Sequence, residues 1–328
     1  MKGEERSGGV LSTDRADGQT QPRPEHRGVY PSLFTLHSSP VTPSPAQPGG
    51  PVGAALGARR WHFQHGPIDL IIGADGAADA IATAVRCAWA RFETILPELV
   101  SELPLLRSPV QEASGLRGVV ARRMLAACAP HGNEFITPMA AVAGAVADEL
   151  IEFFSSDPRI GRAYANNGGD IALHLSPGQS YGVGVFADLA RVKRRESLAL
   201  DGELKVHAAS PVRGIATSGW RGRSFSLGIA DSVTVLAANA AAADAAATMV
   251  ANCVNSDDPA ILRKPACELK DDTDLGERLV TVGVGALPAD TVEQALAGGV
   301  RRAEQLIASG LIHCAALWLQ GRVRLVGC

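Results

Sequence analysis

Residues 232–252 read SVTVLAANAAAADAAATMVAN and predict a β-strand followed directly by a helix. The β-branched residues between Ser232 and Leu236 favour the strand. The alanine-rich stretch that follows predicts a helix over about residues 239–252. Asn239 and Asp244 make this stretch too polar to span a membrane, so it is better suited to a buried helix. The strand and helix together predict a domain in which a sheet packs against helices.

Further strands and helices are predicted on both sides of this unit. The predicted helices cover residues 77–99, 118–129 and 138–154, and another is opened by Asp290. The predicted strands cover residues 61–64, 68–72, 170–175, 181–186, 204–208, 224–229 and 279–284, and a final hairpin turns at Gln320-Gly321. The fold class predicted from this order is α+β (mixed α/β), with two layers.

Local signals predict how three of these helices begin or end. Pro97 is expected to kink or shorten the last turn of the first helix. Thr137 can cap the helix that starts at Pro138, a residue suited to a first turn. Asp290, with Glu293 three residues later, forms the pattern of a capping box.

The N-terminal part of the chain has a different composition. Residues 1–57 contain eight of the twenty prolines, with serine, glycine and arginine around them. Such a segment cannot bury enough apolar surface to offset its ordering entropy, so a flexible tail is expected. A partner-binding arm is the less favoured alternative. Order is expected from Arg60, and the folded domain from residue 58 to residue 328.

Composition excludes several classes of protein. A net charge of −3 and 5% aromatic residues favour neither nucleic acid nor an anionic membrane as a partner. The six cysteines show no CxxC pair and no zinc spacing. They are interpreted as buried thiols of a reducing compartment, although spacing alone leaves a disulfide open. With no signal sequence or apolar span found, the protein is expected to be cytoplasmic.

Three stretches contain residues suited to binding or catalysis. Asn166-Asn-Gly-Gly-Asp170 brings open backbone close to a ligand, or is an ordinary tight turn. Gly214-Ile-Ala-Thr-Ser-Gly-Trp220, with Arg221 and Arg223 after it, offers hydroxyls and charge to a phosphate from a loop.

The third stretch is the pair Asp244 and Thr248 on the alanine-rich helix. A spacing of four places their oxygens on one helix face, and both are donors that magnesium prefers. The alternatives are a solvent-facing aspartate or a local bond from side chain to backbone.

In this order, the motifs resemble those of the ApbE-like proteins, whose founding activity is the transfer of FMN from FAD to a protein threonine. The resemblance covers about residues 60–325 and is nearest to a short, uncharacterised branch. Thr137-Pro-Met-Ala-Ala-Val-Ala-Gly-Ala-Val-Ala-Asp148 and Ala243-Asp-Ala-Ala-Ala-Thr248 belong to the same resemblance. It implies a two-layer, T-fold-like domain.

The resemblance also implies a ligand set. Magnesium (Mg²⁺) would be held by Asp244, Thr248 and a backbone carbonyl near Ala140 or Ala141. FAD or FMN, or another phosphorylated small molecule, would contact residues of the two glycine-containing motifs: Asn167, Gly168, Gly169, Asp170, Thr217, Ser218 and Gly219. A cation on the diphosphate would neutralise charge that develops as a threonine oxygen attacks phosphorus.

Two departures from the family pattern affect the expected activity. Ala143 stands where transferases of the family have a lysine, and residues 225–231 lack the family's histidine. Either loss would be expected to slow phosphoryl transfer strongly. The expected function is therefore a magnesium-dependent flavin-nucleotide protein, with FMN transfer to an acceptor flavoprotein as its activity if it is an enzyme. The alternatives are a non-catalytic flavin-binding or accessory protein of a reductive or sulfur-assimilation pathway, working with a reductase, and an enzyme with an unrelated substrate.

Overall fold

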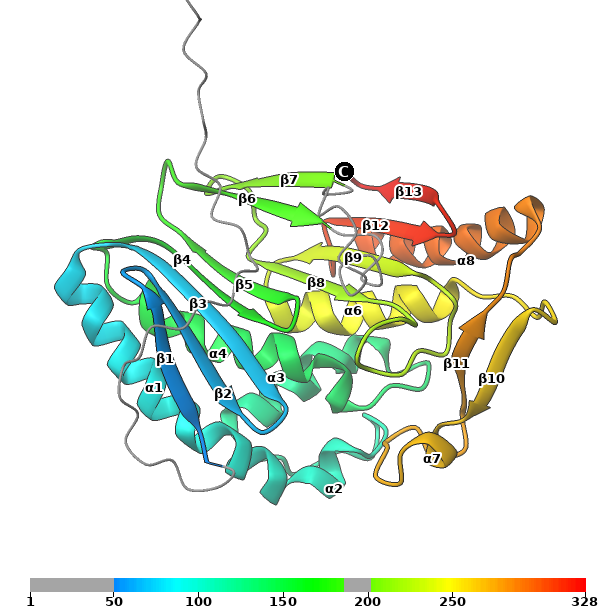
Figure 1. The fold of residues 1–328 in the computed structure, drawn as a ribbon, viewed down its shortest axis with the longest axis horizontal. Helices are drawn as coiled ribbons and strands as arrows, with labels where there is room; N and C mark the ends of the chain where they lie inside the picture. Colours follow the sequence, from blue (N-terminus) through cyan, green and yellow to red (C-terminus); the bar gives the residue numbers. More distant parts are fainter. Residues whose placement is uncertain (1–49, 186–201) are drawn as a thin grey trace, which may run out of the picture. The chain divides into compact units, whose positions relative to one another are not determined.

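The computed structural model describes residues 50–185 and 202–328. Its main feature is a nine-stranded sheet in the order β1-β2-β3-β4-β5-β8-β9-β12-β13, in which all neighbouring strands are antiparallel (Figure 1). The strands are β1 Val52–Gly57, β2 Arg60–His65, β3 Ile68–Gly76, β4 Ile160–Asn167, β5 Asp170–Leu175, β8 Gly214–Ser218, β9 Ser232–Ala237, β12 Cys314–Leu319 and β13 Arg322–Val326.

Helices cover one face of this sheet in the order of the strands below them. They are α1 Ala78–Ser101, α4 Val142–Ser155, α6 Ala240–Cys253 and α8 Ala289–Ala308. Helix α1 contacts β2 and β3, α4 contacts β4 and β5, α6 contacts β8 and β9, and α8 contacts β12 and β13. The α+β class and the two-layer arrangement predicted from the sequence are confirmed.

Shorter elements pack around these two layers. Helix α3 (Val119–Cys128) and the 3₁₀ turn η2 (Pro138–Ala141) contact both α4 and α6. The remaining short helices are α2 Leu103–Leu106, η1 Ala129–His131 and α7 Ala266–Leu269. Two separate strand pairs complete the fold: β6 Ser180–Val185 with β7 Gly202–His207, and β10 Ile261–Pro265 with β11 Leu279–Val284. Apolar residues of β6 and β7 pack against those of β5, β8 and β9 in one cluster.

The ordered domain begins earlier than the sequence predicts. Residues 52–57, expected to lie in a flexible tail, form β1 and pair with β2 along the sheet edge. All six residues are exposed, so backbone pairing rather than apolar burial holds them there. Close packing contributes at Gly53, where an added Cβ would lie 2.7 Å from the Trp89 ring. Residues 1–49 of the predicted tail, and Phe186 at the end of a predicted strand, lie outside the described residues.

Two segments that precede α6 in the chain differ from their predicted structure. The Thr-Ser-Gly segment was expected to be a loop, but residues 214–218 are strand β8. Residues 224–229 were expected to be a strand, but they form none. They bond instead to the carboxyl end of α6. The N–H of Leu227 donates to Asn252 Oδ1 (3.1 Å), and that of Ile229 donates to the Val254 carbonyl (2.8 Å).

The predicted helix ends are partly wrong. Helix α1 continues through Pro97 to Ser101. Proline has no N–H for the Glu93 carbonyl, but both residues are exposed, so water can bond to that carbonyl instead. The Thr137 side chain does not cap its helix and donates instead to Asp274. Helix α8 begins one residue before Asp290 and has no side-chain cap.

Two of the six cysteines are not thiols. Cys314 and Cys328 form a disulfide with a Cα–Cα distance of 5.2 Å, so the prediction of buried thiols is wrong for this pair. It is also wrong for Cys87, which is exposed. The chain turns back after β13 at Gly327 (φ 75°), which brings Cys328 to the start of β12. Within the described part of the chain, no helix is long and apolar enough to cross a membrane.

Candidate functional site

The first turn of α6 lies in a narrow space between α4 and β8. A Cβ added to Gly144 of α4 would lie 2.3 Å from the Ala240 carbonyl oxygen. A Cβ added to Gly214 of β8 would lie 2.0 Å from the Asn239 carbonyl. Real Cβ atoms essentially never approach other atoms this closely, so both positions require glycine for this packing. These two contacts place the start of α6 beside the start of α4.

The amino end of α6 is capped from two directions. Asn239 Oδ1 accepts from the N–H of Ala242 (2.8 Å). The Asp148 carboxylate, on α4, accepts from the N–H groups of Ala240 (2.9 Å) and Ala241 (2.8 Å). Burial raises the pKa of Asp148 to about 6, while these two N–H groups oppose the shift. The carboxylate satisfies two backbone donors that the helix itself leaves unpaired.

Asp244 makes the corresponding contact in the opposite direction. Its Oδ2 accepts from the N–H of Gly144 (3.0 Å), and the N–H of Ala143 also bonds to the carboxylate. Each helix therefore supplies an aspartate to the first turns of the other. Asp148 is 5% exposed, whereas Asp244 is only partly buried. Asp244 is thus the member of the pair that a ligand can reach.

The β4–β5 turn is tied to the same end of α4. Gly168 (φ 69°) and Gly169 (φ 121°) form the turn, and Asn167 and Asp170 pair across it. The buried Asn167 side chain donates through Nδ2 to the Ala143 carbonyl (3.2 Å). The predicted glycine motif is therefore a tight hairpin turn that also contacts the first turn of α4.

Asp170 and Asp244 form a pair of neighbouring carboxylates. Burial raises the pKa of Asp170 to about 7, opposed by the N–H of Thr217 (3.2 Å from Oδ1) and by the charge of Arg223. Burial also raises the pKa of Asp244, and the negative charge of Asp170 raises it further. Two such groups are stabilised by a shared proton or by a cation.

The side chains of the Thr217-Ser218-Gly219 segment do not all face the site. Thr217 is on the sheet face opposite the helices, because strand residues alternate and its neighbour Ile215 packs with β6 and β7. Its hydroxyl bonds to Thr234 (2.9 Å), so only its backbone N–H reaches Asp170. Ser218 faces the helices, since its partner Val233 belongs to the core beneath α6. Gly219 packs against the Asp231 carbonyl.

The remaining predicted ligands lie on α6 and on the turn beside it. Thr248 is partly exposed, one turn after Asp244 on the same helix face. Ala140 and Ala141 belong to η2, which contacts α6. Ala140 is partly exposed and Ala141 is buried. No group of three or more histidine, cysteine or acidic residues suited to a metal occurs within residues 50–185 and 202–328.

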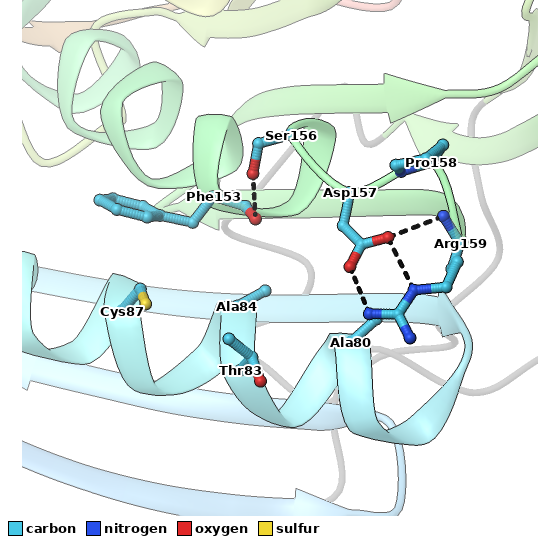
Figure 2. A pocket seen from close by; sticks show the side chains of 9 residues that line it. All are labelled: Ala80, Thr83, Ala84, Cys87, Phe153, Ser156, Asp157, Pro158 and Arg159. Atoms are coloured by element: carbon cyan, nitrogen blue, oxygen red, sulfur yellow. Dashed lines mark hydrogen bonds and ion pairs between the residues drawn. The ribbon is translucent and has the colours of Figure 1, made fainter.

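Two cavities are lined by neither Asp170, Asp244 nor the Gly168-Gly169 turn. One of about 490 Å³ lies between α1 and the loop after α4, with Ala84 and Cys87 on one side and Phe153 on the other (Figure 2). At its end, Arg159 forms an ion pair with Asp157 (2.7 Å). A second cavity, of about 200 Å³, is lined by Arg123, Asn239 and His131, among others. Burial, followed by the charge of Arg302, lowers the pKa of His131 to about 4.

We expect the free energy of unfolding of the metal-free protein to decrease as pH rises from about 4 to 7. The ordinary pKa of Asp170, 3.8, rises to about 7 in the folded state, and that of Asp148 rises to about 6. Over this range the two carboxyl groups of the folded protein hold protons that the unfolded chain has released, so linkage makes stability fall with rising pH. The pKa of His131, lowered from 6.5 to about 4, acts in the opposite direction but offsets only part of the two carboxyl shifts. Denaturant titrations in EDTA should show this slope, weakened in Asp170→Asn. Equal slopes in both proteins would contradict the assignment.

Sequence comparisons give relatives over most of the described domain. Residues 54–325 match the model of a family described as AbpE bacteria. A UPF0280 protein of Methanopyrus kandleri is 33% identical over 241 residues, which cover 70% of this chain and 91% of the relative. A UPF0280 protein of Methanosarcina barkeri is 35% identical over 201 residues (59% of this chain, 72% of the relative). A UPF0280 protein of Methanocaldococcus jannaschii is 34% identical over 138 residues, which cover 42% of this chain and 52% of the relative. These names state no activity.

Proposed function

We propose that this chain, which belongs to the family described as AbpE bacteria and is similar to UPF0280 proteins, binds a flavin nucleotide together with magnesium. The observation that carries this proposal is the meeting of three motifs distant in sequence. The turn at Gly168-Gly169 and Asp244 both bond to the first turn of α4. The end of β8 bonds to Asp170, at the other side of the turn. The resemblance to ApbE-like flavin transferases supplies the ligand class.

The residues present fit a magnesium ion that completes its shell with ligand and water oxygens. Magnesium sites of this kind use one or two carboxylates plus substrate phosphates rather than a cage of acidic side chains. Asp244 and Asp170 provide two neighbouring carboxylates whose mutual repulsion a cation would relieve. Asp244, the Thr248 hydroxyl and a carbonyl of η2, with Ala140 the candidate, would hold the ion. The bound ion would supply positive charge to a diphosphate.

The chain's own groups would position the nucleotide around this ion. Open backbone at Gly169, where an added Cβ would meet nothing within 4 Å, allows close approach of a phosphate or of the flavin. Ser218 presents a hydroxyl on the helix-facing side of the sheet. Asn167 holds the turn against α4 through the Ala143 carbonyl, so the two sides of the site keep a constant spacing.

A non-catalytic role is the second candidate, because two groups expected of a transferase are missing. Ala143 lies in the first turn of α4, and its backbone carbonyl contacts Asn167, but its methyl side chain supplies no charge. Residues 225–231 contain no histidine and bond to the carboxyl end of α6. A flavin-binding or accessory protein that works with a reductase would need neither group. An FMN transferase would need other residues to stabilise the leaving group.

Calorimetric titration tests the ligand. We expect FAD to bind the full-length protein in the presence of magnesium and to bind at least about tenfold more weakly in EDTA, since the ion offsets repulsion between diphosphate and carboxylates. FMN and AMP serve as partial ligands that separate the contributions of the two halves of FAD. Absence of FAD and FMN binding with and without magnesium would overturn the flavin proposal.

A transfer assay then separates the two candidates. The protein, FAD and magnesium are incubated with a flavoprotein that carries a threonine acceptor segment, and covalent FMN is followed by in-gel fluorescence. Covalent labelling would identify a transferase. FAD binding without labelling or AMP release would favour the accessory role.

A further inference from the structure

The segment after β8 is anchored at its base. The Trp220 N–H donates to the Ala230 carbonyl (3.0 Å), and its indole Nε1 donates to Asp231 Oδ1 (3.2 Å). The N–H of Gly222 donates to the Gly219 carbonyl (3.0 Å), closing a turn. These bonds set the place from which the next residue, Arg223, leaves the backbone.

Arg223 lies over the β4–β5 turn. A Cβ added to Gly168 would lie 2.0 Å from Arg223 Nη2, so the guanidinium occupies the space above that glycine. The residue is exposed, and no hydrogen bond or ion pair joins it to a residue of the described ranges. Its charge nevertheless acts on Asp170. Arg223 therefore places a guanidinium beside the carboxylate pair, with donors that no described residue takes up.

The neighbouring arginine is used differently. Arg221 forms an ion pair with Asp231 (3.3 Å) and lies over the Trp220 ring, with its guanidinium carbon 4.9 Å from the ring centroid. Arg221 thus holds the segment together, whereas Arg223 keeps its donors for a ligand.

We propose that Arg223 binds a phosphate group of a ligand seated on the Gly168-Gly169 turn. This inference rests on the proposed nucleotide site and adds to it a specificity-determining residue. The planar guanidinium offers paired N–H donors that match two phosphate oxygens. Gly168 makes room for the guanidinium, and a Cβ added to Gly169 would meet nothing within 4 Å, which leaves space for the phosphate beside it. The ligand class is a diphosphate, because one phosphate can face the cation at Asp244 while the next meets Arg223.

Binding of inorganic pyrophosphate with magnesium tests the inference without a flavin. We expect Arg223→Ala to weaken pyrophosphate binding about 10- to 100-fold in calorimetry, as charged hydrogen bonds of this kind are lost. Arg223→Lys keeps the charge but loses the paired geometry, so an intermediate affinity is expected. Arg301→Ala, an exposed arginine on α8, is the matched control and should bind as the wild type does.

The outcomes separate this inference from the flavin proposal. Equal pyrophosphate affinity in the wild type and in Arg223→Ala would overturn the role of Arg223, even if FAD binds with magnesium. Absence of pyrophosphate binding to the wild type would overturn it as well. Pyrophosphate binding that depends on Arg223, with no binding of FAD or FMN, would support the inference and refute flavin as the ligand.

Discussion

Asp244→Asn is expected to abolish magnesium-dependent FAD binding while the protein stays folded. Asparagine keeps an oxygen that can accept from the N–H groups of Gly144 and Ala143, so the contact between α4 and α6 survives. It removes the negative charge that a magnesium ion requires. Changes to residues that only support a metal ligand lower metal affinity about 10- to 100-fold. We therefore expect the loss of the ligand Asp244 to lower magnesium affinity about 100-fold or more.

The same substitution should stabilise the metal-free protein near pH 8. Asp244 is destabilised there by its burial and by the charge of Asp170, and a neutral amide removes both penalties. Thermal unfolding in EDTA should therefore give a higher melting temperature for Asp244→Asn than for the wild type. The two effects have opposite signs, which separates loss of a metal site from general damage.

Asp148→Asn provides the matched control. Asp148 makes the reciprocal contact, to Ala240 and Ala241, but is buried away from solvent. Its substitution should change stability and leave the magnesium dependence of FAD binding intact. If Asp244→Asn keeps the full magnesium dependence, Asp244 is only a partner for the first turn of α4, and the metal assignment is wrong.

Gly214→Ala is expected to destabilise the folded protein by about 3 kcal/mol or more, at the upper end of overpacking effects. The added methyl group would lie 2.0 Å from the Asn239 carbonyl, and the neighbouring atoms are backbone, which cannot rotate away as a side chain can. Either α6 or β8 must shift, and the cap at Asn239 shifts with it. A fall in melting temperature of the order of 5–10 °C should follow in thermal unfolding.

Gly161→Ala is the control for this prediction. Gly161 is also a strand residue, on β4, but an added Cβ would meet only ordinary contacts, the nearest at 3.7 Å. It should change the melting temperature little, whereas Gly144→Ala, 2.3 Å from the Ala240 carbonyl, should act like Gly214→Ala. If Gly214→Ala and Gly161→Ala unfold alike, the close approach of α6 to β8 is wrong.

The sequence predicted most elements because their signals are local. Three predictions depend on residues near in the chain: the strands at 61–64 and 68–72, the helix over 77–99 and the Gln320-Gly321 hairpin. All three are confirmed. The errors occur where a distant segment competes. Residues 224–229 have strand-like composition, but the carboxyl end of α6 offers them bonding partners that no local pattern records. Thr137 has the chemistry of a cap, and Asp274, far along the chain, takes its hydroxyl.

The site shows the same division between local and distant causes. Its residue types could be found from the sequence: the double glycine, the helical Asp244 and the arginines after β8. The contacts of Asp148 could not be found from the sequence, although an aspartate directly after the apolar residues 142–147 of a predicted helix was the available signal. Nor could local pattern show that the Thr217 hydroxyl points away from the helices, because this requires knowing that residues 214–218 are a strand and which face is covered.

The sequence by itself determined most of the helices and strands, since hydrophobic periodicity, turn residues and helix-forming alanines act within a few residues. Only the tertiary structure decided that Asp170 and Asp244 become neighbours, and that Asp148 and Asp244 each bond to the first turns of the other's helix. The physical reason is close packing: Gly144 and Gly214 allow the backbone of α6 to approach α4 and β8 more closely than any side chain would permit. Charges separated by about 75 residues then share one low-dielectric environment, and their pKa values depend on each other.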